Sequence, residues 1–310
     1  DLKPGTEYRF RIGKGEKEHR FQTMPAKATN SFQFVSGGDS GWSSSARATN
    51  VLAAKQDPMF VLMGGDIAYD NGVLGFANLR FLKNYTADML DSSGRIIPIV
   101  PAIGNHETTL FFGGLSAPYF QSLYGGLFAE RTYASLDFGD YLSLVLLDTG
   151  HIAKIEGEQT AWLDQQLAER TERPHLIVAQ HVPSYPSYRS FNSTGRSSRN
   201  EWVPLFQKHN VDVVLEHHDH TFKRTHPLHD GLVNKNGLVY LGDGSWGALR
   251  RLHDVESRQY LATASSNYHV TLHRIAGETR FQMALANSGR VVDVTTTTKR
   301  PRRPVGRAGI

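Results

Sequence analysis

The chain of 310 residues contains no cysteine. This absence excludes disulfide frameworks, thiolate zinc sites, iron–sulfur clusters and cysteine nucleophiles. Any bound metal must therefore be held by His, Asp, Glu, Asn or Tyr. Long apolar runs are absent as well, since none approaches the roughly 18–20 residues that a membrane-spanning helix needs, and we expect no membrane span.

The formal net charge of +4 is concentrated at one end of the chain. Residues 299–310 contain five basic residues and no acid; without these five, 29 basic residues face 30 acidic ones, a net charge of −1. A near-neutral body with a basic end gives little support to nucleic-acid binding, which we do not expect. The threonine run and basic residues of 295–310 predict a disordered tail.

Residues 1–26 predict a β-hairpin, with strands over Glu7–Gly13 and Glu18–Thr23 and a turn rich in Gly and Lys between them. The stretch Leu2, Pro4, Gly5, Thr6 and Tyr8 resembles the strand entry of fibronectin-type sandwiches. We therefore interpret residues 1–26 as the C-terminal hairpin of a fibronectin-like domain, residues 27–30 as a linker and residues 31–294 as the catalytic domain.

From Ser31 onward, short apolar runs alternate with helical patterns, which is typical of an α/β core. The helical patterns are Ala46–Gln56 and a segment in which Trp202, Leu205, Phe206 and His209 recur at helical spacing. Short β-branched runs favour buried strands. The predicted strands are Phe32–Val35, Met59–Met63, Ile96–Val100, Leu142–Leu147, Leu176–Ala179 and Val211–Leu215.

Five of these six runs lead to residues that can bind metals. In open α/β sheets, ligands gather beyond the carboxyl ends of the strands, so side chains far apart in the sequence would meet there. Carboxylate, phenolate and amide oxygens together with imidazoles suit iron, manganese or zinc. The five segments are Gly38-Asp39-Ser40-Gly41, Gly65-Asp66-Ile67-Ala68-Tyr69, Gly104-Asn105-His106-Glu107, His181, and Glu216-His217-His218-Asp219-His220.

Two details of these segments carry further expectations. His218 and His220, two residues apart, would emerge on the same side of an extended segment. Asp148, which ends the sixth run, is expected to cap a turn or to support a ligand.

In their order, the segments GDSG, GDIAY, GNHE, VAQH and HHDH resemble the motifs of purple acid phosphatases, within the calcineurin-like metallophosphoesterases. The resemblance covers roughly residues 31–294. It implies an α/β fold in which a double β-sheet sandwich is flanked by helices (αββα). It also implies a dinuclear centre of Fe(III) and a second divalent metal, which would be Fe, Zn or Mn.

Carried over to this chain, the resemblance implies two ligand sets that share a bridging Asp66. Most metallophosphoesterases have a histidine at the position of Gly41; Tyr69 would replace it, and a phenolate favours ferric iron. The ferric site would be built from Asp39, Asp66, Tyr69 and His220, and the divalent site from Asp66, Asn105, His181 and His218.

The implied reaction is hydrolysis of a small phosphate monoester by metal-bound hydroxide. His106 resembles the histidine that contacts the substrate phosphate and helps to protonate the leaving oxygen. In place of the family's phosphate-binding histidines, residues 184–199 offer Tyr185, Arg189 and Arg196, which we predict to bind substrate.

His217 stands where the family has glycine, so a backbone that needs a positive φ there would be strained; we assign it no metal.

Two alternatives remain open at this stage. One is a phosphodiesterase of the same fold that uses Mn or Zn. The other, of a different class, is a catalytically silent binding or adhesion module. The resemblance favours a secreted or periplasmic enzyme, and the oligomeric state is not predicted.

Overall fold

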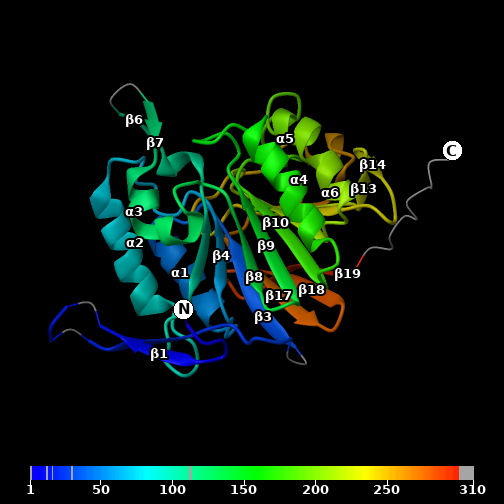
Figure 1. The fold of residues 1–310 in the computed structure, drawn as a ribbon. Coiled ribbons are helices and arrows are strands. Elements are labelled where there is room, and N and C mark those ends of the chain that lie inside the picture. Colours follow the sequence, from blue (N-terminus) through cyan, green and yellow to red (C-terminus); the bar gives the residue numbers. More distant parts are fainter. Residues whose placement is uncertain (1, 12, 16, 29–30, 112–113, 300–310) are drawn as a thin grey trace.

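The computed structural model describes residues 2–11, 13–15, 17–28, 31–111 and 114–299. Two β-sheets lie face to face, with α1–α3 beside one and α4–α6 beside the other (Figure 1). The predicted double sandwich flanked by helices is confirmed. Within the described residues, no helix is long and apolar enough to cross a membrane. The helices are α1 (Ser44–Ala54), α2 (Gly75–Asp88), α3 (Pro118–Phe128), α4 (Glu158–Arg170), α5 (Arg196–Glu201) and α6 (Val203–Lys208), with 3₁₀ turns at Asn105–Glu107 and Val255–Ser257.

The first sheet has six strands in the order β19-β18-β17-β3-β4-β5. Strands β3, β4 and β5 are parallel, and β17 pairs antiparallel with β3. The carboxyl ends of these three parallel strands, where the polar residues follow, therefore lie at one edge of the sheet. The bounds are β3 (Phe32–Gly37), β4 (Val61–Gly64), β5 (Ile99–Ala102), β17 (His269–Ala276), β18 (Thr279–Ala286) and β19 (Val291–Thr298).

The second sheet has seven strands in the order β16-β12-β15-β11-β10-β9-β8. Its centre, β9 to β15, is parallel, and antiparallel strands lie at both edges. The bounds are β8 (Ala134–Phe138), β9 (Leu142–Leu147), β10 (His175–Gln180), β11 (Val213–Glu216), β12 (Phe222–Thr225), β15 (Val239–Asp243) and β16 (Leu261–Ser265).

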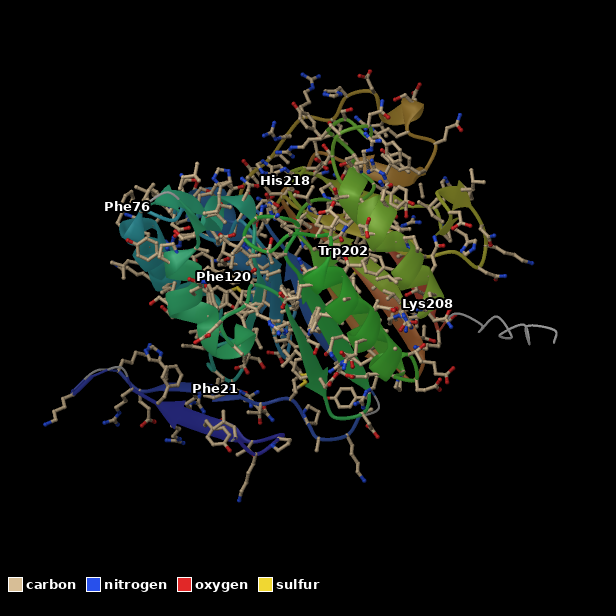
Figure 2. The ribbon with its side chains drawn as sticks, turned by 45° about the horizontal axis from the view of Figure 1, so that its top comes forward. Phe21, Phe76, Phe120, Trp202, Lys208 and His218 are labelled. Atoms are coloured by element: carbon tan, nitrogen blue, oxygen red, sulfur yellow. The ribbon has the colours of Figure 1, made fainter. Side chains whose placement is uncertain are left out.

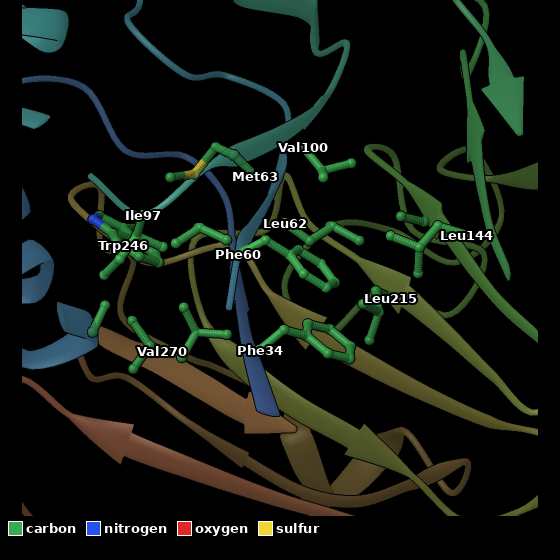
Figure 3. Close-up of a cluster of buried hydrophobic side chains, with 14 of the residues drawn as sticks. Phe34, Phe60, Leu62, Met63, Ile97, Val100, Leu144, Leu215, Trp246 and Val270 are labelled. Atoms are coloured by element: carbon green, nitrogen blue, oxygen red, sulfur yellow. The ribbon is translucent and has the colours of Figure 1, made fainter. Parts of the chain in front are cut away.

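The core lies between the sheets, where alternate residues of each strand meet. Phe34 and Leu62 from the first sheet pack in one cluster with Leu144 and Leu215 from the second (Figure 3). The intervening residues of the second sheet, such as Val145, point to the other side and pack under α4 and α6. Burial on both faces explains why the strands read as continuous apolar runs.

In the part of the chain that the structure describes, three two-stranded sheets accompany the two large ones. The N-terminal hairpin pairs β1 (Glu7–Phe10) with β2 (His19–Gln22), so the predicted hairpin is confirmed with shorter strands. Its assignment to a fibronectin-like domain stays a prediction. The other two pairs are β6 (Thr109–Phe111) with β7 (Gly114–Ser116), and β13 (Leu228–His229) with β14 (Leu232–Val233).

Two sequence predictions need correction. Thr295–Thr298, expected to begin a disordered tail, form the end of β19 and pair with β18, because β-branched threonines suit an edge strand. Residues 300–310 lie outside the described part of the chain. The helical pattern around Trp202 is divided into α5 and α6, since Pro204 stands in the first turn of α6 and cannot continue a hydrogen-bonded helix.

Candidate metal centre

The predicted ligands lie in the loops that follow five parallel strands of the two sheets. Figure 2 places His218 between the part of the molecule that carries α2 and α3 and the part that carries α4–α6. The sheets thus contribute to one site from opposite sides. Asp39 follows β3, Asp66 and Tyr69 follow β4, Asn105 follows β5, His181 follows β10, and His218 and His220 follow β11.

One group of ligand atoms forms around Asp39. His220 Nε2 lies 2.9 Å from Asp39 Oδ1. Tyr69 Oη lies 3.2 Å from His220 Nε2 and 3.5 Å from Asp39 Oδ1. Asp39, Asp66 and His220 offer ligand atoms that lie within 4.8 Å of one another, as a metal site requires.

A second group forms around His181. Its Nε2 lies 3.1 Å from His218 Nδ1, 3.2 Å from Asn105 Oδ1 and 3.4 Å from Asp66 Oδ2. The atoms of Asp66, His181 and His218 also lie within 4.8 Å of one another. Asp66 therefore belongs to both groups.

The two nearby histidines of the HHDH segment diverge. His218 faces the second group and His220 the first. The expectation that both emerge on the same side of an extended segment is wrong, because φ is +73° at His218 and +56° at His220. The left-handed turns direct the two imidazoles to different groups.

Five of the seven predicted ligands have a positive φ, the other three being Asp39 (+57°), Asp66 (+51°) and Tyr69 (+53°). Such backbone costs of order 1–3 kcal/mol per residue and persists where the surroundings hold it in place. Here the loops after β3 and β4 are joined by backbone hydrogen bonds: the N–H groups of Asp39, Ser40 and Gly41 donate to the carbonyls of residues 65, 66 and 67. The ligands are therefore held before any cation binds.

Glu107 braces the two loops that carry Asp66 and Asn105. Its carboxylate accepts the backbone N–H of Gly104 (2.7 Å), Asp66 (2.8 Å) and Ile67 (2.7 Å). Burial and the neighbouring Asp66 raise the pKa of Glu107 to about 8. The sequence contained Glu107 within GNHE, but only the structure reveals this bracing contact.

The electrostatics of the site match a cation. Burial alone would raise the pKa of Asp66, but His181 and His106 outweigh it and hold that pKa well below its usual range. Burial, together with Asp39 and Asp66, raises the pKa of the Tyr69 phenol far above its usual value. Asp66 Oδ2 is buried and has no hydrogen-bond partner. An unsatisfied buried carboxylate oxygen among oxygen and imidazole donors fits a bound metal ion.

His106 lies at the open side of the site. Its backbone N–H donates to Asp66 Oδ1 (2.8 Å), and its Nε2 lies 3.9 Å from Asp66 Oδ2. Its other ring nitrogen, Nδ1, hydrogen-bonds to Asn71 Oδ1. The hydrogen bond with Asn71 fixes how the His106 ring faces the ligands. Asn71 was not identified from the sequence, although it stands two residues after Tyr69.

His217 is accommodated by two glycines. Its Nδ1 lies 2.9 Å from the carbonyl of Gln180, and its φ is not positive. A Cβ on Gly64 would lie 1.9 Å from the His217 ring, and one on Gly38 would lie 2.6 Å from it. The strain expected for a positive φ does not arise, because φ at His217 is not positive, and the two glycines leave space for the imidazole.

The three predicted substrate-binding residues lie in different surroundings. Tyr185 is 2% exposed and packs on Tyr240, with ring centroids 4.5 Å apart, so its assignment to substrate is wrong. Arg189 donates to the carbonyl of His218 and, over 3.1 Å, to Asp219 Oδ1. Arg196 is exposed at the first residue of α5. Substrate binding by Arg189 and Arg196 stays a prediction.

The loop after β9 brings a further histidine to the site. Asp148 caps this loop, since its carboxylate accepts the N–H groups of His151 (2.6 Å), Ile152 (3.0 Å) and Ala153 (2.8 Å), which confirms the expected cap. The His151 ring packs edge-on against His181, with centroids 5.5 Å apart. No motif in the sequence indicated this contact.

The chain is similar to known acid phosphatases. Purple acid phosphatase 21 of Arabidopsis thaliana is 26% identical over 261 residues, which cover 78% of this chain and 56% of that protein. Acid phosphatase type 7 of Danio rerio is 26% identical over 354 residues, covering 98% of this chain and 77% of the relative. The chain thus spans little more than half the length of the Arabidopsis relative.

Among solved structures, the purple acid phosphatase PPD1 from yellow lupin (Lupinus luteus) seeds has a TM-score of 0.74 at 20% identity; the match covers 96% of this chain and 60% of the lupin chain. This likeness supports the fold. The profile of the calcineurin-like phosphoesterase family matches residues 19–222, about two thirds of the chain. With that match and the two ligand groups at the strand ends, the chain belongs to the calcineurin-like metallophosphoesterase family.

Proposed function

We propose that this protein is a dinuclear-metal phosphatase that hydrolyses phosphate monoesters. The observation that carries the proposal is that the two ligand groups share Asp66, whose Oδ2 is buried without a hydrogen bond. A carboxylate with two oxygens can bridge two cations. Asp39, Asp66, Tyr69 and His220 would hold one cation, and Asp66, Asn105, His181 and His218 would hold the other.

Tyr69 supports ferric iron as the first metal. Burial and two carboxylates oppose ionisation of its phenol, so a phenolate forms there only beside a cation of high charge. The Tyr69 ring also lies beside Gly41, where a Cβ would be 3.4 Å from it, and so fills the space that a larger residue 41 would take. The second metal would be divalent Fe, Zn or Mn.

When bound, such a pair of cations supplies Lewis-acid stabilisation of the phosphoryl oxygens and a nucleophile at mildly acidic to neutral pH. The chain adds proton transfer. The His106 side chain is 36% exposed, with its Nε2 3.9 Å from Asp66 Oδ2 and its Nδ1 hydrogen-bonded to Asn71. We assign it contact with the phosphate and protonation of the leaving oxygen. No protein nucleophile is required.

The test combines metal content, colour and activity on one purified sample. We expect two metals per chain, a visible tyrosinate-to-ferric absorption band, and faster hydrolysis of 4-nitrophenyl phosphate than of bis(4-nitrophenyl) phosphate. Tyr69→Phe should lose the band. Tyr141→Phe is the matched control, because Tyr141 is buried and donates to the Pro25 carbonyl far from the ligands.

Other outcomes would change the proposal. A colourless, active enzyme with Mn or Zn and a preference for the diester would favour a phosphodiesterase of this fold. A protein that binds no metal would contradict both readings.

A further inference from the structure

An apolar pocket of about 310 Å³ lies beside the candidate metal ligand Tyr69. A cavity of roughly 150 Å³ is already large enough for a benzene ring. Of the seven lining residues, the largest side chains are those of Trp42 and Tyr69, and the others are small. The lining consists of Ser40, Gly41, Trp42, Ser43, Tyr69, Gly247 and Ala248.

The pocket is built on the backbone of the candidate metal site. The N–H groups of Gly247 and Ala248 both donate to the carbonyl of Asp39, over 3.0 and 2.9 Å. The N–H of Gly41 donates to the carbonyl of Ile67 over 2.8 Å. The floor of the pocket is therefore attached to the loops that carry Asp39 and Tyr69, and a group seated there would lie beside the candidate ligand Tyr69.

Two lining positions are suited to glycine, Gly41 by its backbone conformation and Gly247 by its close approach to Ser40. Gly41 has φ +64°, a conformation that strains other residues, and a Cβ there would touch the Tyr69 ring at 3.4 Å. A Cβ on Gly247 would lie 1.9 Å from the Ser40 carbonyl oxygen. Larger side chains at either position would displace the ring or the loop.

The side-chain oxygens of the seven lining residues are already used within the protein. Ser40 Oγ donates to the Gly41 carbonyl (3.2 Å), and Ser43 Oγ accepts the N–H of Ala46 as the N-cap of α1 (3.1 Å). The Tyr69 hydroxyl faces His220 Nε2 at 3.2 Å. A polar leaving group such as a sugar would find few partners there, whereas an apolar ring would lose little on leaving water.

Trp42 forms an aromatic wall of the pocket, and residues of α2 hold it in place. It is 37% exposed, an unusual position for the largest apolar side chain. Arg80 of α2 lies over its ring at 4.9 Å from the centroid, and Asn84 Nδ2 donates to its carbonyl over 3.2 Å. A fixed, partly exposed indole is well suited to stack against another aromatic ring.

We propose that this pocket binds the leaving group of the substrate, and that the preferred substrates are aromatic phosphate esters. The inference rests on the proposed phosphatase function, because it takes the phosphate to lie at the ligand groups. It adds the chemical class of the ester, which the metal ligands do not specify.

The test is calorimetric titration of the metal-loaded protein with phenylphosphonate and with methylphosphonate. The two probes share the phosphonate head, are not hydrolysed as esters, and differ by the ring. We expect phenylphosphonate to bind about tenfold more tightly, as burial of an aromatic ring provides. A readout by binding keeps the pocket separate from the rate of catalysis.

Variants of the lining residues test whether the preference for the phenyl compound arises in this pocket. Trp42→Ala and Ala248→Leu should each bring the ratio of the two affinities close to one while leaving methylphosphonate affinity unchanged, and Trp42→Phe should keep most of the preference. Phe281→Ala, at a 44% exposed aromatic on β18, is the matched control and should keep the wild-type ratio.

The two proposals fail in different ways. Tight methylphosphonate binding without a preference for the phenyl compound overturns the pocket alone. A preference that survives both Trp42→Ala and Ala248→Leu also overturns it, because the ring would then lie elsewhere. If neither phosphonate binds, the pocket proposal and the phosphatase proposal fall together.

Discussion

The two ends of the parallel strands in the second sheet both bury charged side chains, but in opposite ways. At the amino ends, Arg280 and Asp212 are 1% and 0% exposed and lie 3.2 Å apart. Arg280 Nη1 also lies 2.9 Å from Nδ1 of His175, and Asp212 Oδ2 accepts the N–H of Leu176 over 2.7 Å. This cluster, Arg280, Asp212 and His175, balances its charge within the protein.

At the carboxyl ends of the strands, candidate metal-ligand atoms converge on a common region instead. Asp39 and Asp66 meet His181, His220 and the Tyr69 hydroxyl within a few ångströms, and no lysine or arginine stands among these ligands. The ligand backbone is left-handed at five positions, whereas the residues of the amino-end cluster have no positive φ. Buried charges that neutralise each other depend on both partners being present, whereas buried charge arranged around a common point suits a cation.

The largest effect should come from Asp66→Asn at the carboxyl ends. An amide cannot bridge two cations as a carboxylate can. Because the loss of a residue that merely supports a ligand lowers metal affinity or activity 10–100-fold, we expect the rate of 4-nitrophenyl phosphate hydrolysis to fall by roughly 10³-fold or more. The free energy of unfolding of the metal-free protein should change little, because the amide oxygen can still accept the His106 N–H. An unchanged hydrolysis rate would contradict the role of Asp66 as a shared metal ligand, and a wild-type protein without hydrolytic activity would favour the silent binding module.

Arg280→Met should have the converse effect at the amino ends. Removing the guanidinium takes one cationic partner from the buried Asp212, while Lys299 Nζ stays 3.6 Å from Asp212 Oδ2. The free energy of unfolding should therefore fall by about 3 kcal/mol, the lower end for a broken buried ion pair. Activity per folded molecule should be retained, since Arg280 lies at the far end of the strands. Urea unfolding and specific activity at equal folded fraction measure both. A variant of wild-type stability would show that the pair contributes nothing.

His175 predicts how this end responds to acid. Burial, and then Arg280, lower the pKa of His175 to about 4. The unfolded chain takes up this proton near pH 6.5 and the folded chain near pH 4, so the associated stability is present above pH 6.5 and lost as the pH falls to 4, by about 3 kcal/mol in total. Urea unfolding of metal-free wild type and His175→Gln across this range should give a flatter profile for the variant; parallel profiles would rule the effect out.

Asn71 should produce the smallest effect, at the carboxyl ends. Asn71→Gly removes the oxygen that holds His106 Nδ1 while tolerating the φ of +50° at this position. We expect kcat to fall about tenfold with KM and metal content unchanged, as for loss of an outer-shell partner. Asn71→Asp keeps an acceptor and should restore most of kcat. Equal losses in both variants would mean that Asn71 acts on the loop and not through His106.

Much of the candidate metal centre at the carboxyl ends of the strands could be predicted, because its residues follow strands that are easy to recognise. Asp39 and His220 are 181 positions apart, yet each stands just beyond an apolar run, and parallel strands deliver their ends to one edge. The predicted β9 agrees residue for residue with Leu142–Leu147. The predicted β5 was placed too early, and the strand begins at Ile99, after Pro98.

The sequence predictions were wrong or incomplete where the role of a residue depends on which side chains pack against it. Tyr185 has the chemistry to contact a substrate or to pack in a core, and only its neighbour Tyr240 settles which. Asn71 and His151 carry no motif, and their roles depend on contacts with His106 and His181. His217 would strain a backbone of positive φ, but its φ is not positive, and Gly38 and Gly64 make space for its ring.

By itself, the sequence indicated the kinds of ligand atom that a metal site in this chain could use and the sheet edge where those residues lie. Without cysteine, the ligands had to be oxygens and imidazoles, and strand periodicity carried them to one side of the molecule. Only the tertiary structure decided which histidine faces which ligand group, which oxygen lacks a partner, and where an apolar pocket opens beside Tyr69. These features depend on left-handed turns and on contacts between the two sheets, which residue spacing along a single chain does not encode.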